Sequence, residues 1–233
     1  MHVFLKKSIY GKVERPYHYK FLVLLPLEAD EKIKVLQHYF GITFDNVLVL
    51  RGIEIRRHDA PAFIKHFQTQ LLYTLFDCMD SSEIRTKGYE NALLLVTQAI
   101  GMIMTGECID NKDLIIFKLL RQDIQKYRSL FPHVSAAIQS KKYPLKGDRI
   151  QYIYTDSQHN NPLCRVAPIE KFSSLPPYDK EKYKEMILDA AETVLGFFGF
   201  DRSAYSNPKK GRRKKWYEEL KEQRTKDIEP EMV

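Results

Sequence analysis

The hydrophobic pattern of this chain changes near residue 60, and the change restricts the fold more than any other feature. Before it, the apolar runs HVFL, KFLVLLPLE and VLVLRGIEIRR are separated by Gly11, Pro16 and Gly41, which is typical of strands. After it, apolar side chains recur at helical spacing over long segments. The sequence therefore predicts an α+β fold with a β-rich N-terminal part and a mainly helical remainder.

Three local features add detail near the end of the β-rich part. The residues from Asp30 to Tyr39 fit one short helix. Arg51 and Gly52 interrupt the third apolar run, which indicates a bulge or a close approach of two backbone segments. The motif HDAP then fits a helix start in which Asp59 is the N-cap and Pro61 lies in the first turn.

Three long helices are predicted after residue 60. The second extends from Tyr89 to about Met104 and is apolar almost all round, so we expect it to be well buried. The third extends from Asp179 to about Phe198, with apolar residues on one face. The first helix carries a core-facing stripe made of Phe63, Ile64, Phe67, Leu71, Leu72 and Leu75.

Shorter elements are predicted between these helices. The run DLIIFKLL from Asp113 is apolar and bounded by polar residues, which predicts a strand, and RQDIQKYRSLF fits one or two helical turns. Pro132 opens a short helix, because a proline in the first turn loses no hydrogen bond. The run KGDRIQYIYTD predicts a strand after a turn. The helical part should therefore contain a small antiparallel sheet.

Composition bounds the possible partners and the location of the chain. Its 233 residues carry a formal net charge of +7, which suits a polyanion such as nucleic acid but also ordinary solubility. Cys78, Cys108 and Cys164 are far apart and form no metal-binding spacing, so reduced intracellular thiols are expected. No signal peptide is recognised, and the longest apolar run, Phe21 to Leu27, is too short for a bilayer. We expect a cytoplasmic protein without a membrane partner.

Motifs for catalysis are missing from the sequence. It contains no GxSxG, GxxxxGK[ST], HExxH or GxGxxG. Asp156 ends a predicted strand, but Asp148 at the other end of that strand lies about 25 Å away, too far to share a metal ion. Asp156 is therefore interpreted as a turn residue. We expect a binding or structural body with no catalytic residue, no metal site and no cofactor on this chain.

Two other features suggest contact with phosphate. His58 and His133 each stand at a predicted helix N-terminus, where N–H groups attract anions, although a solvated or capping histidine fits equally well. The tail from residue 206 to 233 holds six Lys or Arg between Lys209 and Lys215, beside Trp216 and Tyr217. Cations next to aromatic rings suit nucleic acid, and a solvated flexible arm is the alternative.

The segment from Arg51 to Phe76 resembles the junction of palm and thumb in family B DNA polymerases, especially archaeal ones. In that family a Gly-hydrophobic-Glu strand is followed by an Arg-Arg-Asp signature and a long helix. Arg57 and Asp59 match the first Arg and the Asp, whereas His58 replaces the second Arg with a side chain that is not permanently charged at neutral pH.

Further segments resemble the same family in the same order. LIIFKLLRQDIQKYRSLFPHVSAA matches the thumb pattern of a strand with Lys, a Tyr, and Pro-His-Val opening a helix. KGDRIQYIY and YDKEKYKEMILDAAETVLGFFGF match the following strand and the closing thumb helix, so the resemblance covers about Val47 to Phe200. Near the N-terminus, FLKKSIYGKV is similar to the family's Lys-Lys-x-Tyr-x-Gly strand, although Tyr10 is displaced by one position. Residues 14–46 are not matched.

The segment YTDS resembles the catalytic Asp-Thr-Asp-Ser motif of the family, and its position shows whether Asp156 could have that role. Tyr154 occupies the place of the first Asp, and the segment follows the Pro-His-Val helix inside the thumb. Asp156 is therefore not expected to be catalytic. The catalytic palm motifs, fingers and exonuclease of the family would precede this chain.

The resemblance implies the small subunit of a split family B DNA polymerase. Residues 1–58 would form the end of the palm, 59–205 the thumb and 206–233 a flexible basic tail. The large subunit would carry the exonuclease, the catalytic palm, the fingers and Mg²⁺, and would complete its sheet with strands between Val3 and Arg57. The isolated chain is expected to be inactive. The residues expected to contact the phosphates of double-stranded primer–template DNA are Lys6, Lys7, Tyr10, Arg51, Arg57, His58, Lys118, Arg121, His133, Lys141, Lys142, Arg212, Arg213 and Lys214.

Two alternatives remain open from the sequence. The chain fits a stand-alone basic nucleic-acid-binding or scaffold protein derived from a polymerase thumb, and it also fits a fragment of a longer polymerase gene. The tail lacks the aromatic pair of a sliding-clamp peptide, so direct clamp binding through the tail is not predicted.

Overall fold

The first sheet of the protein is antiparallel and has three strands among the residues that the structure describes. This computed structural model describes residues 18–24, 39–53, 55, 57, 59–107, 109–140, 143–171 and 176–205. The strands are β1 (Tyr19–Leu24), β2 (Tyr39–Thr43) and β3 (Leu48–Arg51), in the order β1-β2-β3. Gly41 lets β1 approach β2, because a Cβ there would lie 2.6 Å from the carbonyl oxygen of Phe21.

The sequence predicted two of these strands and missed one. KFLVL and LVLR form β1 and β3, and Gly52 ends β3 with a left-handed φ of 75°. Tyr39 begins β2, so the predicted helix is wrong at that residue. The rest of that prediction, and the predicted HVFL strand, lie outside the described residues.

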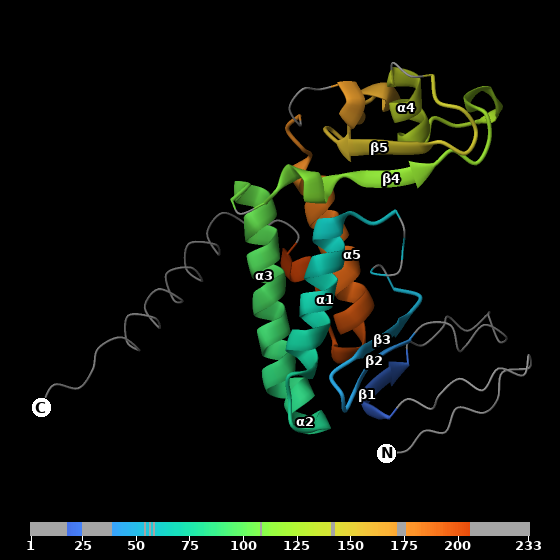
Figure 1. The fold of residues 1–233 in the computed structure, drawn as a ribbon. Coiled ribbons are helices and arrows are strands. Elements are labelled where there is room, and N and C mark those ends of the chain that lie inside the picture. The colour runs from blue at the N-terminus through green and yellow to red at the C-terminus, as the bar shows by residue number, and fades with distance from the viewer. Residues whose placement is uncertain are drawn as a thin grey trace, which may run out of the picture. The chain divides into compact units, whose positions relative to one another are not determined.

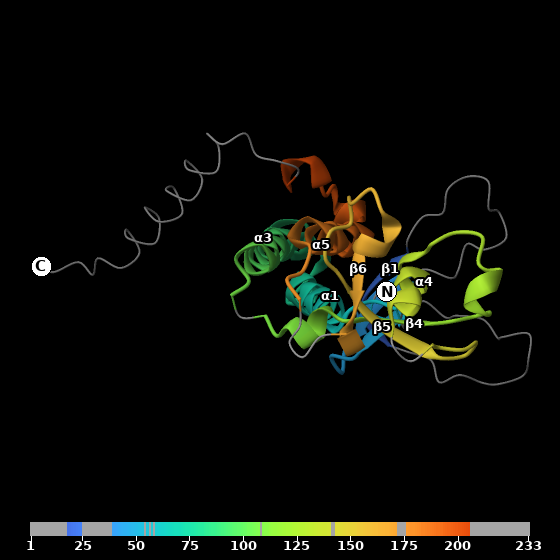
Figure 2. The ribbon, with the colours of Figure 1, turned by 90° about the horizontal axis from the view of Figure 1, so that it is seen from above.

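Three long helices pack side by side in the next part of the chain (Figures 1 and 2). They are α1 (Ala62–Phe76), α3 (Tyr89–Thr105) and α5 (Lys180–Leu195). Between the first two, α2 (Ser81–Glu83) leads into a π-helical turn, η2 (Ile84–Gly88). Their buried apolar residues include Ile64, Phe67, Leu71, Leu72, Leu75, Val96, Ile103, Tyr183, Ile187 and Val194.

The helix positions agree with the sequence prediction, but two details were wrong. Asp59 is not the N-cap of α1: Pro61 takes that position without a side-chain hydrogen bond, and the Asp59 carboxylate binds two cations instead. The second helix is not buried all round, because α3 packs against other helices on one face only. Ala92 and Val96 are fully buried, whereas Leu94 is 46% exposed.

A second antiparallel sheet contains β4 (Ile116–Leu119), β5 (Arg149–Tyr154) and β6 (Val166–Pro168), in that order. Helix α4 (Pro132–Gln139) packs on this sheet, as Figure 1 shows. Their shared core consists of Ile116, Leu120, Ala136, Ala137, Ile150, Tyr152 and Val166.

The sequence predicted β4, β5 and α4 but not the short strand β6. The predicted strand at DLIIFKLL begins too early, because Asn111–Leu114 forms a 3₁₀ turn (η3). The Asp110 carboxylate accepts a hydrogen bond from the Lys112 N–H and stabilises that turn. A second 3₁₀ turn, Ile124–Lys126 (η4), agrees with the helical turn predicted between β4 and α4.

Two buried polar side chains form hydrogen bonds between the long helices and neighbouring segments. The Gln68 amide on α1 accepts a hydrogen bond from the Ile55 N–H and donates one to the Ala190 carbonyl on α5. The Tyr183 hydroxyl on α5 donates to the Leu114 carbonyl just before β4. Each bond satisfies a backbone group at a junction between elements, so both side chains fix how the segments meet.

The α+β prediction is confirmed for the described part of the chain. The chain divides into two units, residues 1–198 and residues 199–233. In the described part of the second unit, Arg202–Tyr205 forms a 3₁₀ turn (η8). The predicted boundaries at residues 58 and 205 stay predictions. Among the described residues no helix combines the length and the apolar character needed to cross a membrane.

Candidate functional site

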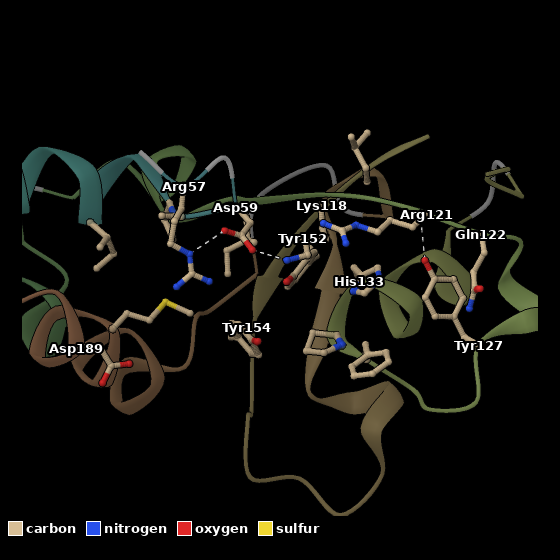
Figure 3. Close-up of a pocket in the computed structure, with 18 residues that line it drawn as sticks. Arg57, Asp59, Lys118, Arg121, Gln122, Tyr127, His133, Tyr152, Tyr154 and Asp189 are labelled. Atoms are coloured by element: carbon tan, nitrogen blue, oxygen red, sulfur yellow. Dashed lines mark hydrogen bonds and ion pairs between the residues drawn. The ribbon is translucent and has the colours of Figure 1, made fainter. Parts of the chain in front are cut away.

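An open cavity of about 720 Å³ lies between the start of α1, the β4–β5 sheet and the start of α4 (Figure 3). Four basic side chains line it: Arg57 precedes α1, Lys118 lies on β4, Arg121 follows β4, and His133 is the second residue of α4. Asp59 and Asp189 also line it. The remaining lining residues are Ala60, Pro61, Ile64, Ile116, Leu119, Gln122, Tyr127, Phe131, Pro132, Tyr152, Tyr154 and Met186.

Asp59 binds two of these four basic side chains. Its carboxylate accepts a hydrogen bond from Arg57 Nε at 3.2 Å and another from Lys118 Nζ. Burial alone would raise the pKa of Asp59, but the Lys118 hydrogen bond and the nearby charges of Arg57 and Lys118 lower it below its ordinary 3.8. Asp59 is therefore ionised at neutral pH and joins a segment before α1 to strand β4.

Tyr127 contacts both of the other two basic residues. The Arg121 N–H donates to the Tyr127 hydroxyl at 2.9 Å. The Tyr127 ring lies edge-on to His133, with centroids 5.5 Å apart, and Phe131 lies nearly parallel to His133, with centroids 6.0 Å apart. Burial, followed by the charges of Lys118 and Arg121, lowers the pKa of His133 below 6.5, so the imidazole is neutral at pH 7.

Two tyrosines of β5 form part of the cavity wall (Figure 3). The rings of Tyr152 and Tyr154 meet at an interplanar angle of 76°, with centroids 5.8 Å apart. Burial is the main cause that raises the pKa of both phenols above 10, so neither ionises near neutral pH. The cavity thus combines a cationic rim with a neutral, largely aromatic wall.

The structure brings four of the predicted contact residues together: Arg57, Lys118, Arg121 and His133 all line the cavity. Arg51 ends β3, is exposed and does not line it. The predicted contacts outside the described residues are Lys6, Lys7, Tyr10, His58, Lys141, Lys142, Arg212, Arg213 and Lys214.

Two features of the cavity were missed from the sequence. Tyr152 and Tyr154 stand two positions apart on a strand, so the strand period could have placed both on one face. The pairing of Asp59 with Lys118 carried no local signal, because 59 positions separate the two residues.

Asp148 and Asp156, at the two ends of β5, make separate hydrogen bonds. Within the described part of the chain, no three His, Cys, Asp or Glu side chains cluster to hold an ion. Asp156 is exposed in a turn, where its carbonyl accepts a hydrogen bond from the His159 N–H. The Asp148 carboxylate instead accepts a hydrogen bond from the Leu145 N–H at the far end of β5. No chemistry at a metal is therefore assigned to these residues.

Comparison with known proteins identifies the family. The sequence model of DNA polymerase family B matches residues 34–196, which include every residue that lines the cavity. The chain belongs to this family. The Archaeoglobus fulgidus DNA polymerase is 28% identical over 145 residues, which cover 58% of this chain and 17% of that protein. The Pyrococcus horikoshii DNA polymerase is 26% identical over 171 residues, which cover 70% of this chain and 13% of that protein.

A solved structure shows the same fold. The family B DNA polymerase of Pyrobaculum calidifontis superposes with a TM-score of 0.59 at 21% identity, covering 72% of this chain and 21% of that one. The chain thus spans about a fifth or less of the length of these polymerases. The cavity lies in the part that family B polymerases share with it.

Proposed function

We propose that this chain is the small subunit of a split family B DNA polymerase and supplies the end of the palm and the thumb. In this proposal residues 1–58 belong to the palm, 59–205 to the thumb, and 206–233 form a flexible basic tail. The family match supports the polymerase origin.

The observation that carries a DNA-binding role is the set of basic side chains around one cavity. Arg57, Lys118, Arg121 and His133 come from three segments of the chain and line the same hollow. Lys and Arg side chains neutralise phosphates without reading sequence, and a polymerase needs this because it moves along any template. The cations therefore suit the backbone of a primer–template duplex.

The first sheet supports the proposed subunit interface. Within the described residues, β1 and β3 each pair with β2 alone, so each has one side without a strand neighbour. Such an edge accepts a further strand through main-chain hydrogen bonds. A strand of the large subunit would extend the sheet here and would join the palm across the two polypeptides.

The contribution of the chain to catalysis would be positioning. The cavity would hold the duplex so that the primer end stays beside the carboxylates and Mg²⁺ of the large subunit. The chain alone would incorporate no nucleotide and would act in the cytoplasm. This role requires binding and orientation only, and the basic side chains that line the cavity suit it.

Reconstitution with a large subunit tests the proposal. A family B polymerase polypeptide that lacks its own thumb would be purified with and without this chain and tested for primer extension. We expect co-purification and longer extension products only when both chains are present. Extension by this chain alone, or an unchanged product length on its addition, would exclude the proposed role.

A charge variant links that activity to the cavity. Lys118→Gln with Arg121→Gln should shorten the products of the reconstituted enzyme. Arg85→Gln with Lys87→Gln removes the same charge from exposed positions outside the cavity and serves as the matched control. Equal losses in the two double variants would show that net charge, rather than this groove, supports extension.

A further inference from the structure

The mouth of the cavity carries an exposed aromatic ring that phosphate binding alone does not explain. Phe131 precedes α4, lines the cavity and is 51% exposed. One side of the ring lies against His133, nearly parallel at an interplanar angle of 17°, and Tyr127 meets it edge-on. Phe131 is thus held by two neighbouring rings while half of its surface stays in solvent, where an apolar ring is normally unfavourable.

The charges near this ring are distributed unevenly. Asp59 partly neutralises Arg57 and Lys118 by binding both of them. Arg121 is exposed, and among the described residues no acidic side chain pairs with it. Arg121 also lies close enough to His133 to lower its pKa. A cation available to phosphate therefore stands next to the exposed aromatic group.

The dimensions of the cavity exceed what a duplex backbone requires. A phosphate on the outside of a double helix needs only cations at a surface, whereas this cavity has a volume of about 720 Å³, within the range of small-molecule sites. Its wall holds Tyr127, Tyr152 and Tyr154 behind the cationic rim. An aromatic wall behind cations is the arrangement by which proteins hold single-stranded nucleic acid.

We propose that the cavity binds one unpaired nucleotide of a DNA strand, with its base stacked on Phe131 and its phosphate at Arg121. This inference rests on the proposed DNA-binding function and adds a ligand that a paired duplex does not present. A frayed or mismatched strand end supplies such a nucleotide. The base stacks through its flat face, so the site accepts any base.

Three DNA probes on the full chain test the inference. They are a blunt 20-base-pair duplex, the same duplex with a 3′ tail of three thymidines, and the same duplex with a tail of three abasic residues. The abasic tail keeps the phosphates and removes the bases. Fluorescence anisotropy should show the thymidine tail binding about 5-fold or more tightly than the abasic tail, as expected for base stacking on an aromatic ring.

Matched variants locate that preference. Phe131→Leu should reduce the thymidine-to-abasic affinity ratio to about one. Phe44→Leu is the control, because Phe44 is 73% exposed and does not line the cavity. Its ratio should equal that of the unmodified chain. A ratio unchanged by Phe131→Leu, or reduced equally by both variants, would overturn the inference.

Failure of the inference can be distinguished from failure of the proposed function. If the unmodified chain binds all three probes with equal affinity, the unpaired-nucleotide site is excluded while DNA binding stands. If the chain binds none of the probes, both proposals fail.

Discussion

Asp59 organises the cationic rim at the scale of single residues. Its carboxylate binds both Arg57 and Lys118 and is only about a quarter exposed, with 24% of its side-chain surface accessible. An acid in a cavity that is proposed to bind phosphate weakens the positive potential there, so Asp59 must contribute to side-chain orientation or to stability instead. The first prediction concerns stability.

Asp59→Asn should lower the free energy of unfolding at pH 7 by about 1 to 2 kcal/mol, because charge-assisted hydrogen bonds to two cations are weakened. The pKa of Asp59 is lowered in the folded state, so its contribution is complete above about pH 4 and is lost as the pH falls through the folded pKa. Urea denaturation at pH 7 and pH 3.5 measures this difference. Asp156→Asn, at an exposed turn, is the control and should change little at either pH.

Protonation of His133 should make DNA binding depend on pH. Its pKa lies below 6.5 in the free chain, and a bound phosphate would favour the charged form, so protons and DNA should bind cooperatively. Affinity should therefore rise by roughly 3- to 10-fold between pH 8 and pH 5.5 through this added phosphate contact. His133→Gln should remove most of that rise.

The control for this prediction is His66→Gln, because His66 is exposed on α1 and does not line the cavity. The lowered pKa of His133 also means that its contribution to folding stability is present above about pH 6.5 and declines as the pH falls. Circular dichroism at each pH must therefore accompany the binding titration. Parallel pH curves for the His133 and His66 variants would contradict the assignment.

The sequence predicted which basic residues lie together better than it predicted which side chains bind one another. The sequence indicated Arg57, Lys118, Arg121 and His133 as phosphate contacts, and the structure brings these four together. It did not indicate that Asp59 binds Lys118, because an aspartate before a helix fits an N-cap and an ion pair equally well. Long-range partners depend on how α1 and β4 meet, which no local pattern records.

At the scale of elements, the missing side chain of Gly88 allows η2, just before α3, to lie close to the end of α1. A Cβ at this position would lie 2.5 Å from the Leu75 carbonyl oxygen and 2.8 Å from Cys78 Sγ. The glycine ends the π-helical turn η2, where this close approach occurs. Two glycine-to-alanine substitutions test this packing, one expected to lower the free energy of unfolding and one expected to raise it.

Gly88→Ala should destabilise the protein by about 1 to 3 kcal/mol, because the new methyl group overpacks against backbone. Gly101→Ala within α3 should instead stabilise it by about 0.5 to 1 kcal/mol, since alanine favours helix and nothing lies within 4 Å of the new atom. Thermal denaturation compares the two variants. A shift in the same direction for both would contradict this packing.

Long amphipathic elements were predictable and short ones were not. The three long helices were recognised because several turns of apolar periodicity define α1, α3 and α5. Strands β2 and β6 have 5 and 3 residues, too few for a period to stand out. The burial of α3 was overestimated, because an apolar sequence does not show on how many sides a helix has neighbours.

At the scale of the whole molecule, the order of the segments was more informative than any one of them. Separate resemblances between about Val47 and Phe200 pointed to one family, and the family match over residues 34–196 agrees with that conclusion. The proposed partner polypeptide could not be derived in the same way, because nothing in one chain specifies what a second chain contributes. The split-subunit role therefore depends on the reconstitution described above.

The central claim is that the cavity cations bind DNA phosphates, and its most direct test is the salt dependence of binding. Replacing Arg57, Lys118 and Arg121 with Gln should reduce the slope of log K against log salt by about 2 to 3 for a blunt duplex, since each lost phosphate contact removes about 0.9. The control variant has Gln in place of Lys65, Arg85 and Lys87, which do not line the cavity. A smaller slope in the cavity variant alone is the predicted result. Equal slopes for the two variants would contradict the claim.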